Sequence, residues 1–142
     1  MLPDSSLLQI REYTGLGYKP VVDSGAWRVA ILRYIDELLP DRMDNLHSHT
    51  ETEEVFVLLK GRCILFLAGN GEKPGEIRAA DMEMEKMYVV TKGCWHSHTL
   101  SEDAMVLIVE NRDTDAGNTP HVPLQAEERR RISGITKMLW KT

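Results

Sequence analysis

Two histidines separated by one residue, with a glutamate and a glycine at fixed distances behind them, restrict the fold of this chain more than any other feature. His47 and His49 are followed by Glu54, Gly61 and, some forty residues later, His96. Histidines at i and i+2 on an extended strand point to the same face. Imidazoles plus one carboxylate suit a first-row transition metal and suit calcium or magnesium poorly. The pattern predicts a β-sheet protein with a metal pocket.

The segment HSHTETEEVFVLLKG, residues 47–61, resembles the first sequence motif of the cupin superfamily, G(X)5HXH(X)3-4E(X)6G. The two histidines, the glutamate and the final glycine match it: His47, His49, Glu54 and Gly61. Asp41 occupies the place of the leading glycine.

The segment TKGCWH, residues 91–96, resembles the second cupin motif, G(X)5PXG(X)2H(X)3N, with Gly93 and His96 in register. Three positions depart from it, since Glu85, Thr91 and Leu100 replace a glycine, the proline and the asparagine. The departures affect turns, whereas all four ligand positions are kept. The resemblance covers residues 27–110 and implies that His47, His49, Glu54 and His96 hold one divalent transition metal (Zn, Fe, Mn or Ni).

The resemblance implies an all-β fold, a cupin-type small β-barrel (double-stranded β-helix or jelly roll) of six to eight strands with a C-terminal α-helix. We expect one domain over residues 1–142, with the barrel at about 25–112 and the helical tail at about 124–140. Short β-branched runs separated by turn signals agree with a barrel or sandwich. In the tail, Leu124, Glu128 and Ile132 recur at helical spacing.

Strand alternation predicts which side chains face the interior. If Glu54 points inward, Phe56 and Leu58 share its face, and Glu53 faces solvent. Residues 1–24 are expected to be an irregular lead-in, residues 27–35 an apolar edge strand, and residues 82–85 a half-buried strand. The predicted barrel core includes Val55, Val57, Ile64 and Leu107.

A narrower resemblance runs through GRCILFLAGNGEKPGEIRA, KGCWHSHTL and VLIVENRDTD. The order of these segments is similar to the ureidoglycolate lyase branch of small cupins. It points to small, polar, oxygen-rich substrates.

Two further residues are candidates for proton transfer. His98 shares the parity of His96, so it faces the barrel interior either as a satisfied polar core residue or as a catalytic group. Tyr88 either places its hydroxyl near the pocket mouth or is packed in the core.

Arg78 is either a side chain that binds a substrate carboxylate or an exposed loop residue. His121 is expected alone at the surface.

The function predicted from these residues is a metal-binding cupin that acts on a small polar metabolite by metal-assisted lyase or isomerase chemistry. The alternatives are a non-catalytic sugar-binding or sensor cupin, a metal-dependent dioxygenase, and a degenerate cupin whose histidines bind nothing. Whether the chain is an enzyme stays open at this stage.

Charge and cysteine usage restrict the partners and the compartment. A net charge of −5 argues against nucleic acid and anionic membranes. Cys63 and Cys94 are not CxxC-spaced and no secretory signal is recognisable, which favours reduced thiols in the cytoplasm. Cys94 as a metal ligand is disfavoured by strand parity. We expect a small-molecule ligand and a homodimer formed through the edge at residues 27–35.

Overall fold

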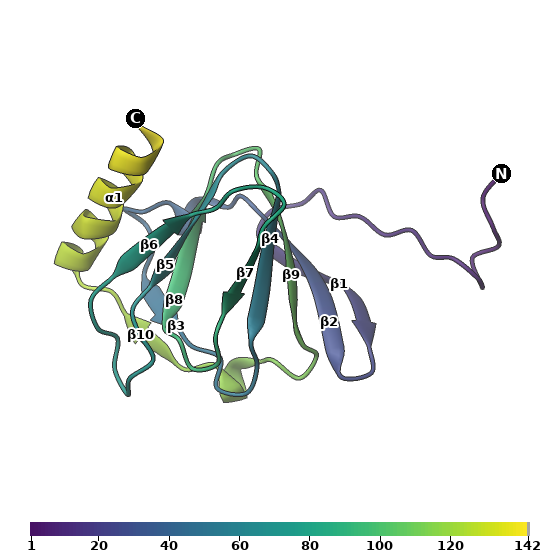
Figure 1. Cartoon of the computed structure of the whole chain (residues 1–142), viewed down its shortest axis with the longest axis horizontal. Coiled ribbons are helices and arrows are strands. Elements are labelled where there is room, and N and C mark those ends of the chain that lie inside the picture. Colours follow the sequence, from purple (N-terminus) through teal and green to yellow (C-terminus); the bar gives the residue numbers. More distant parts are fainter. Residues whose placement is uncertain (142) are drawn as a thin grey trace.

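The computed structural model describes residues 1–141, which contain ten β-strands and one α-helix. The strands pair antiparallel in two sheets, with the orders β1-β2-β9-β4-β7 and β10-β3-β8-β5-β6 (Figure 1). The strands are β1 Tyr18–Ser24, β2 Trp27–Arg33, β3 Asn45–His47, β4 Glu54–Lys60, β5 Cys63–Leu67, β6 Arg78–Asp81, β7 Met87–Val90, β8 His96–Leu100, β9 Met105–Asn111 and β10 His121–Pro123. The α-helix α1 spans Ala126–Trp140, and two short 3-10 helices span Asp36–Leu38 and Ala116–Asn118.

The two sheets face each other across one apolar core, to which both contribute. Its buried members include Leu32, Phe56, Leu65, Val106 and Ile108. The predicted mostly-β fold with a C-terminal helix is confirmed. The sheets are not closed into a barrel, because no strand ladder within residues 1–141 joins one sheet to the other. The strand number exceeds the six to eight expected because β1 and the three-residue strands β3 and β10 carry no strong strand signal of their own.

The helix α1 covers the outer face of the second sheet. Ile132 is fully buried there in a cluster with Ile64 and Phe66 of β5. The Trp140 indole N–H donates to Asp81 Oδ1 at 3.1 Å, which fixes the end of the helix beside β6 (Figure 1). The predicted helical tail therefore packs outside the sheets, as expected. No helix of residues 1–141 is long and apolar enough to cross a membrane.

Alternation along β4 places Glu54, Phe56 and Leu58 in the interior, as predicted, and leaves Glu53 exposed. The same alternation turns Val55 and Val57 outward, where they are half-buried. The prediction that Val55, Val57 and Leu107 form the core between the sheets is therefore wrong. Adjacent residues of one strand cannot share a face.

The N-terminal lead-in is not irregular throughout, because β1 pairs with β2 along its length. Pro20, which lacks a backbone N–H, is tolerated because β1 is an edge strand and its register shifts between Pro20 and Val22. Since β2 lies between β1 and β9, the prediction that residues 27–35 form a free edge is wrong.

Residues 82–85 form no strand, contrary to the alternation of Met82-Glu83-Met84-Glu85. Met82 is buried after the end of β6, and Met84 is exposed in a turn. Glu85 takes a left-handed conformation with φ 68°. This is the position at which the second cupin motif has a glycine, so the turn keeps its shape although the residue differs.

We expect Glu85→Gly to stabilise the fold by about 0.5–1 kcal/mol, because glycine adopts positive φ without the steric cost borne by a side chain. Equilibrium urea unfolding measures the change. Met84→Gly in the same turn is the control, because Met84 has no positive φ and glycine there only adds freedom to the unfolded chain. A loss of stability in Glu85→Gly equal to that of the control would contradict the prediction.

Candidate metal centre

Three strands of the second sheet bring three histidines into one row. His47, the last residue of β3, is the register partner of His121 on β10 and of His96 on β8. The ring of His47 lies 4.4 Å from that of His96 and 5.5 Å from that of His121, between centroids. The other four histidines of the chain all have ring centroids within 6.4 Å of the His47 ring. Sheet pairing therefore gathers residues that are up to 74 positions apart in the sequence.

His49 lies just beyond β3, in a loop that two other segments hold in place. The Gly93 N–H donates to the His49 carbonyl at 2.8 Å, and the Ser48 N–H donates to the Pro120 carbonyl. The His49 Nδ1 is hydrogen-bonded to Thr119 Oγ1 at 2.9 Å. Because Nδ1 is occupied in this way, Nε2 of His49 is directed to the interior.

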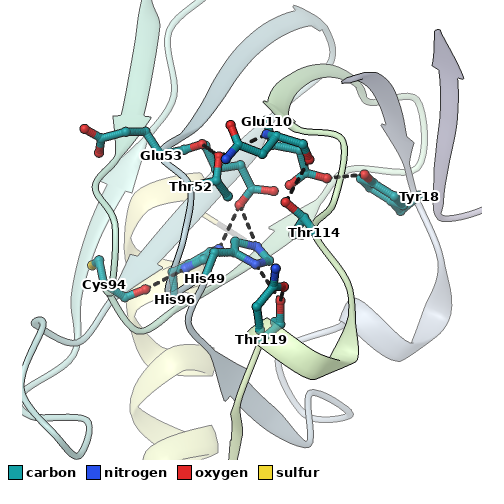
Figure 2. A network of polar contacts seen from close by, with 12 residues as sticks. Tyr18, His49, Thr52, Glu53, Cys94, His96, Glu110, Thr114 and Thr119 are labelled. Atoms are coloured by element: carbon teal, nitrogen blue, oxygen red, sulfur yellow. Dashed lines mark hydrogen bonds and ion pairs between the residues drawn. The ribbon is translucent and has the colours of Figure 1, made fainter. Parts of the chain in front are cut away.

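Glu54 joins the histidines from the first residue of β4. Its Oε1 lies 2.9 Å from His96 Nε2 and 3.3 Å from His49 Nε2. The His96 Nδ1–H donates to the Cys94 carbonyl at 2.8 Å, which leaves Nε2 for the interior. Figure 2 shows the two imidazoles side by side, with Cys94 next to His96 and Thr119 next to His49.

The donor set fits a transition-metal ion. One nitrogen each of His47, His49 and His96 lie within 4.8 Å of one another, as do ligand atoms of His49, Glu54 and Glu110. Ligands of one ion at about 2.1 Å stand about 3 Å apart when adjacent and about 4 Å apart when opposite. The proton on His96 Nδ1 is donated to the Cys94 carbonyl. When the ring carries only that proton, Nε2 presents a lone pair to the Glu54 carboxylate. Two electron-pair donors, His96 Nε2 and Glu54 Oε1, then face each other, and a cation bound to both would remove their repulsion.

The four predicted ligand side chains of His47, His49, Glu54 and His96 are therefore brought together on one side of the fold. None of them faces away from the others. That they bind a metal remains a prediction.

Burial and mutual charge shift the protonation of this cluster. Burial, reinforced by neighbouring histidines, holds the pKa of His47 well below its ordinary value and lowers the pKa of His98 to about 4. For His49, burial lowers the pKa, but the hydrogen bond and charge of Glu54 outweigh it and the pKa is raised. Burial would raise the pKa of Glu54, yet the two imidazoles that contact it hold its pKa well below the usual range. The cluster therefore keeps an ionised Glu54 carboxylate, and burial favours the neutral form of His47 and His98.

Glu110 is a second buried carboxyl that sequence reasoning missed. The Tyr18 hydroxyl donates to Glu110 Oε1, whereas Oε2 is buried without a hydrogen-bond partner (Figure 2). Burial, then the nearby Glu54, raise the pKa of Glu110 to about 7. A signal was present in the sequence, because Val106, Ile108 and Glu110 share one face of β9 and an acidic residue interrupts an apolar series.

A cavity of about 300 Å³ opens over this cluster. Its wall carries Arg28, whose Nε donates to Asp23 Oδ1 at 3.0 Å and whose Nη1 donates to the Thr114 carbonyl at 3.4 Å. The lining residues include Tyr18, Arg28, His47, His49, Glu54, His98, Glu110, Thr119 and His121. Two of the predicted ligand histidines, two further buried titratable residues (His98 and Glu110) and one guanidinium thus border a single space.

The structure places the remaining sequence candidates as follows. His98 lines the cavity, and its Nδ1 is buried without a partner. Tyr88 does not line the cavity, and its hydroxyl accepts a hydrogen bond from the Glu83 N–H at 2.9 Å. Arg78 is an exposed residue of β6 near Glu76. His121 is exposed, as predicted, but it is not alone, because β10 pairs with β3 and places it beside His47.

Comparisons with known proteins identify the fold. No protein-family model matches the sequence, and no curated protein is similar to it. Among solved structures, a cupin-2 domain protein from Shewanella frigidimarina has a TM-score of 0.50 and 17% identity, over 76% of this chain and 88% of that one. Pac13, a nucleoside dehydratase from Streptomyces, has a TM-score of 0.52 and 13% identity, over 82% of this chain and 88% of that one.

A mutant of the oxalate decarboxylase OxdC from Bacillus subtilis also has a TM-score of 0.52, with 18% identity. The match covers 70% of this chain and 25% of that longer one. At these identities the likeness concerns the fold alone, and the partial resemblance to ureidoglycolate lyases stays a prediction. Two facing antiparallel sheets, a His/Glu cluster between them and these neighbours agree with one another: the chain has the cupin fold.

Proposed function

We propose that this protein is a metal-dependent enzyme that performs lyase or isomerase chemistry on a small polar metabolite. One observation carries the proposal. Three of the ligand side chains, His47, His49 and Glu54, line the same cavity as His98 and Glu110, which both have a buried polar atom without a protein partner. A buried polar atom without a partner is costly in a purely structural role. Both residues line the cavity, which makes them the candidates for contact with a bound molecule.

The metal would be one divalent transition ion (Zn, Fe, Mn or Ni) held by His47, His49, Glu54 and His96. When bound, such an ion supplies Lewis-acid polarisation of a substrate oxygen. The protein's own contribution is orientation, because the Cys94 carbonyl and Thr119 Oγ1 fix the rings of His96 and His49. Partners of this kind determine which nitrogen faces the site.

Two side chains are placed to hold or move a proton. His98 lines the cavity, its Nδ1 is buried without a hydrogen-bond partner, and its ring lies 5.8 Å from the Phe56 ring, between centroids. Glu110 Oε2 is free, while Tyr18 donates to Oε1 and so fixes the plane of the carboxyl. Many lyase and isomerase reactions remove a proton at one atom and supply one at another. We assign this work to His98 and Glu110.

Arg28 supports a substrate with an acidic group. The Nε of Arg28 donates to Asp23 and its Nη1 donates to the Thr114 carbonyl, and the Arg28 side chain borders the cavity. The remaining guanidinium edge suits a carboxylate. Together with the resemblance to ureidoglycolate lyases, this makes small α-hydroxy and ureido acids the first substrates to screen. Two fold neighbours, a nucleoside dehydratase and an oxalate decarboxylase, have names that describe lyase reactions.

The cytoplasmic location is part of this proposal. Cys63 and Cys94 are both free thiols. Unpaired cysteines are compatible with a reducing compartment.

The proposal is tested by metal analysis of natively purified protein, followed by a screen of small hydroxy and ureido acids before and after treatment with a chelator. We expect about one transition-metal ion per chain, and activity that is lost on chelation and restored by adding the metal back. Tight binding of a screened acid without any turnover would favour the non-catalytic sensor instead. Oxygen consumption during turnover would favour the dioxygenase.

His98→Ala is expected to lower the rate by about 10²–10⁴-fold while the metal stays bound, since this is the usual contribution of a placed proton-transfer group. Steady-state kinetics and metal content are measured on the same sample. Tyr88→Phe is the control, because the Tyr88 hydroxyl contacts the Glu83 backbone and not the cavity, so its rate should stay near that of the unchanged protein. A His98→Ala rate equal to that of the control would remove His98 from the mechanism.

A further inference from the structure

The hydrogen-bond partners of His49 and His96 differ in kind. The Cys94 carbonyl, 2.8 Å from His96 Nδ1, can only accept a hydrogen bond, so it places a proton on that nitrogen. The partner of His49 Nδ1 is the hydroxyl of Thr119, 2.9 Å away, which can either accept or donate (Figure 2). The tautomer of His49 therefore depends on the direction of the Thr119 hydroxyl, and a further residue has to set that direction.

Glu54 favours the tautomer that would block a metal. Its Oε1 lies 3.3 Å from His49 Nε2. On a neutral ring, a proton on Nε2 would be donated to the carboxylate, and hydrogen bonds to an ionised acceptor are roughly twice as strong as those between neutral groups. That proton would occupy the lone pair with which Nε2 binds a metal. The contacts on the Nδ1 side of His49 must therefore hold the proton there.

Asn118 provides an acceptor for the Thr119 hydroxyl, because its Oδ1 lies 3.4 Å from Thr119 Oγ1. The orientation of the Asn118 amide is fixed by two backbone groups. The Asp115 N–H donates to Oδ1 at 2.9 Å, and Nδ2 donates to the Asp113 carbonyl at 2.7 Å. A reversed amide would set its NH₂ against an N–H and its oxygen against a carbonyl. The oxygen therefore faces Thr119, and the hydroxyl hydrogen is directed to Asn118 and away from His49.

The backbone next to Thr119 is joined to the backbone next to His49. The Thr50 N–H and the Thr50 hydroxyl both donate to the Asn118 carbonyl, at 3.1 Å and 3.0 Å. Asn118 is also the last residue of the short 3-10 helix, whose capping box includes its side chain. Thr119 is buried, which limits competition from water for its hydroxyl. The three side chains are thus held in sequence as Asn118, Thr119 and His49.

We propose that Asn118 is a positioning residue of the metal centre. Its side-chain oxygen accepts a hydrogen bond from the Thr119 hydroxyl. The hydroxyl oxygen then accepts the proton on His49 Nδ1, and Nε2 keeps its lone pair. This inference rests on the metal-dependent function proposed above, because a free Nε2 matters only where a metal binds. His96 needs no such residue, since its carbonyl partner cannot donate.

Nitrogen NMR of the histidine rings in metal-free protein tests the proposal, at a pH above the pKa of His49, where the ring is neutral. The His49 signals are those absent from the spectrum of His49→Ala. We expect the proton on Nδ1 in the wild-type protein and on Nε2 in Asn118→Ala, because the Thr119 hydroxyl is then free to turn toward Nδ1. The affinity for Zn²⁺, measured by competition with a chelating dye, should fall by about 10–100-fold in Asn118→Ala, the usual effect of losing a residue that orients a ligand.

Two variants separate the Asn118 oxygen from the rigidity of its loop. Asn118→Asp keeps an oxygen acceptor for Thr119 and should keep the proton on Nδ1. Asp115→Ala removes the carboxylate that accepts the Gly117 N–H, which loosens the same loop but leaves Asn118 Oδ1 in place. It should also keep the wild-type tautomer.

A wild-type His49 with its proton on Nε2 would overturn the proposal. So would an Asn118→Ala variant that keeps the proton on Nδ1, or an Asp115→Ala variant that shifts it as far as Asn118→Ala does. The tautomer is measured without metal and without substrate. A failure of the proposed function, seen as wild-type protein that binds Zn²⁺ but turns over no substrate, is therefore distinguishable from a failure of this inference.

Discussion

Replacing His49 by alanine is expected to lower turnover by about 10³-fold or more and to deplete the bound metal. Several kcal/mol of transition-state stabilisation depend on a correctly held ion. The fold should survive, because His49 lies in a loop beyond β3 and its ring contacts Thr119 and Glu54, not the apolar core. We expect the free energy of unfolding of the metal-free proteins to differ by less than about 2 kcal/mol. Metal analysis, activity assays and urea unfolding measure the three quantities.

His121→Ala is the matched control for this variant. It removes an imidazole that lines the same cavity and lies beside His47, but that is exposed and stands outside the group of potential ligands. The control should keep its metal. Full activity in the His49 variant, or in wild-type protein stripped of metal, would refute the metal-centred function and favour a binding module.

Part of the His/Glu cluster could be anticipated from the sequence because the geometry of the first motif is local. Strand parity predicts that His47 and His49 point the same way, and their ring centroids do lie 5.3 Å apart, although His49 lies beyond the end of β3. Glu54 is distinguished from Glu53 by parity within β4. The departures from the second motif were expected to affect its turns, and the structure shows that the backbone conformation is kept. Gly61 and Gly93 have φ of 72° and 81°, and Glu85 takes positive φ where the motif asks for glycine.

The rest of the site depends on contacts between distant segments, which no periodicity encodes. Tyr18 and Glu110 are 92 residues apart and meet because β2 carries β1 alongside β9. His121 reaches His47 only because β10, a three-residue strand, pairs with β3. Such short strands are defined by their partners and not by their own composition.

The outer face of the sheet β1-β2-β9-β4-β7 shows a further limit of patterns read one strand at a time. Val55, Val57 and Leu107 were predicted as core because they are apolar and lie in strands. The structure turns them outward, opposite to Glu54, Phe56 and Ile108. The composition of a strand that is apolar on both faces does not reveal which face is turned to the core.

Gly61→Ala is expected to be the most destabilising of the proposed substitutions, at about 2–4 kcal/mol. Gly61 connects β4 to β5 with φ 72°, a conformation that costs a side chain about 1 kcal/mol. An added Cβ would also lie 2.7 Å from the Ala104 Cα and 2.7 Å from Ser101 Oγ. The Ala104 contact is with backbone, which cannot rotate away, so the β4–β5 turn or the start of β9 must shift. Overpacking of this kind adds about 1–3 kcal/mol.

Gly69→Ala separates the two causes. Gly69 has nearly the same φ, 74°, but nothing lies within 4 Å of the added Cβ, so this variant bears the conformational cost alone, about 1 kcal/mol. Both variants are compared by urea unfolding at one protein concentration, because an associating protein unfolds in a concentration-dependent way. The loss in Gly61→Ala should exceed that in Gly69→Ala by the packing cost. Equal losses would show that the turn relaxes freely, and that the glycine of the first motif is required for its backbone angle and not for the close approach of β9.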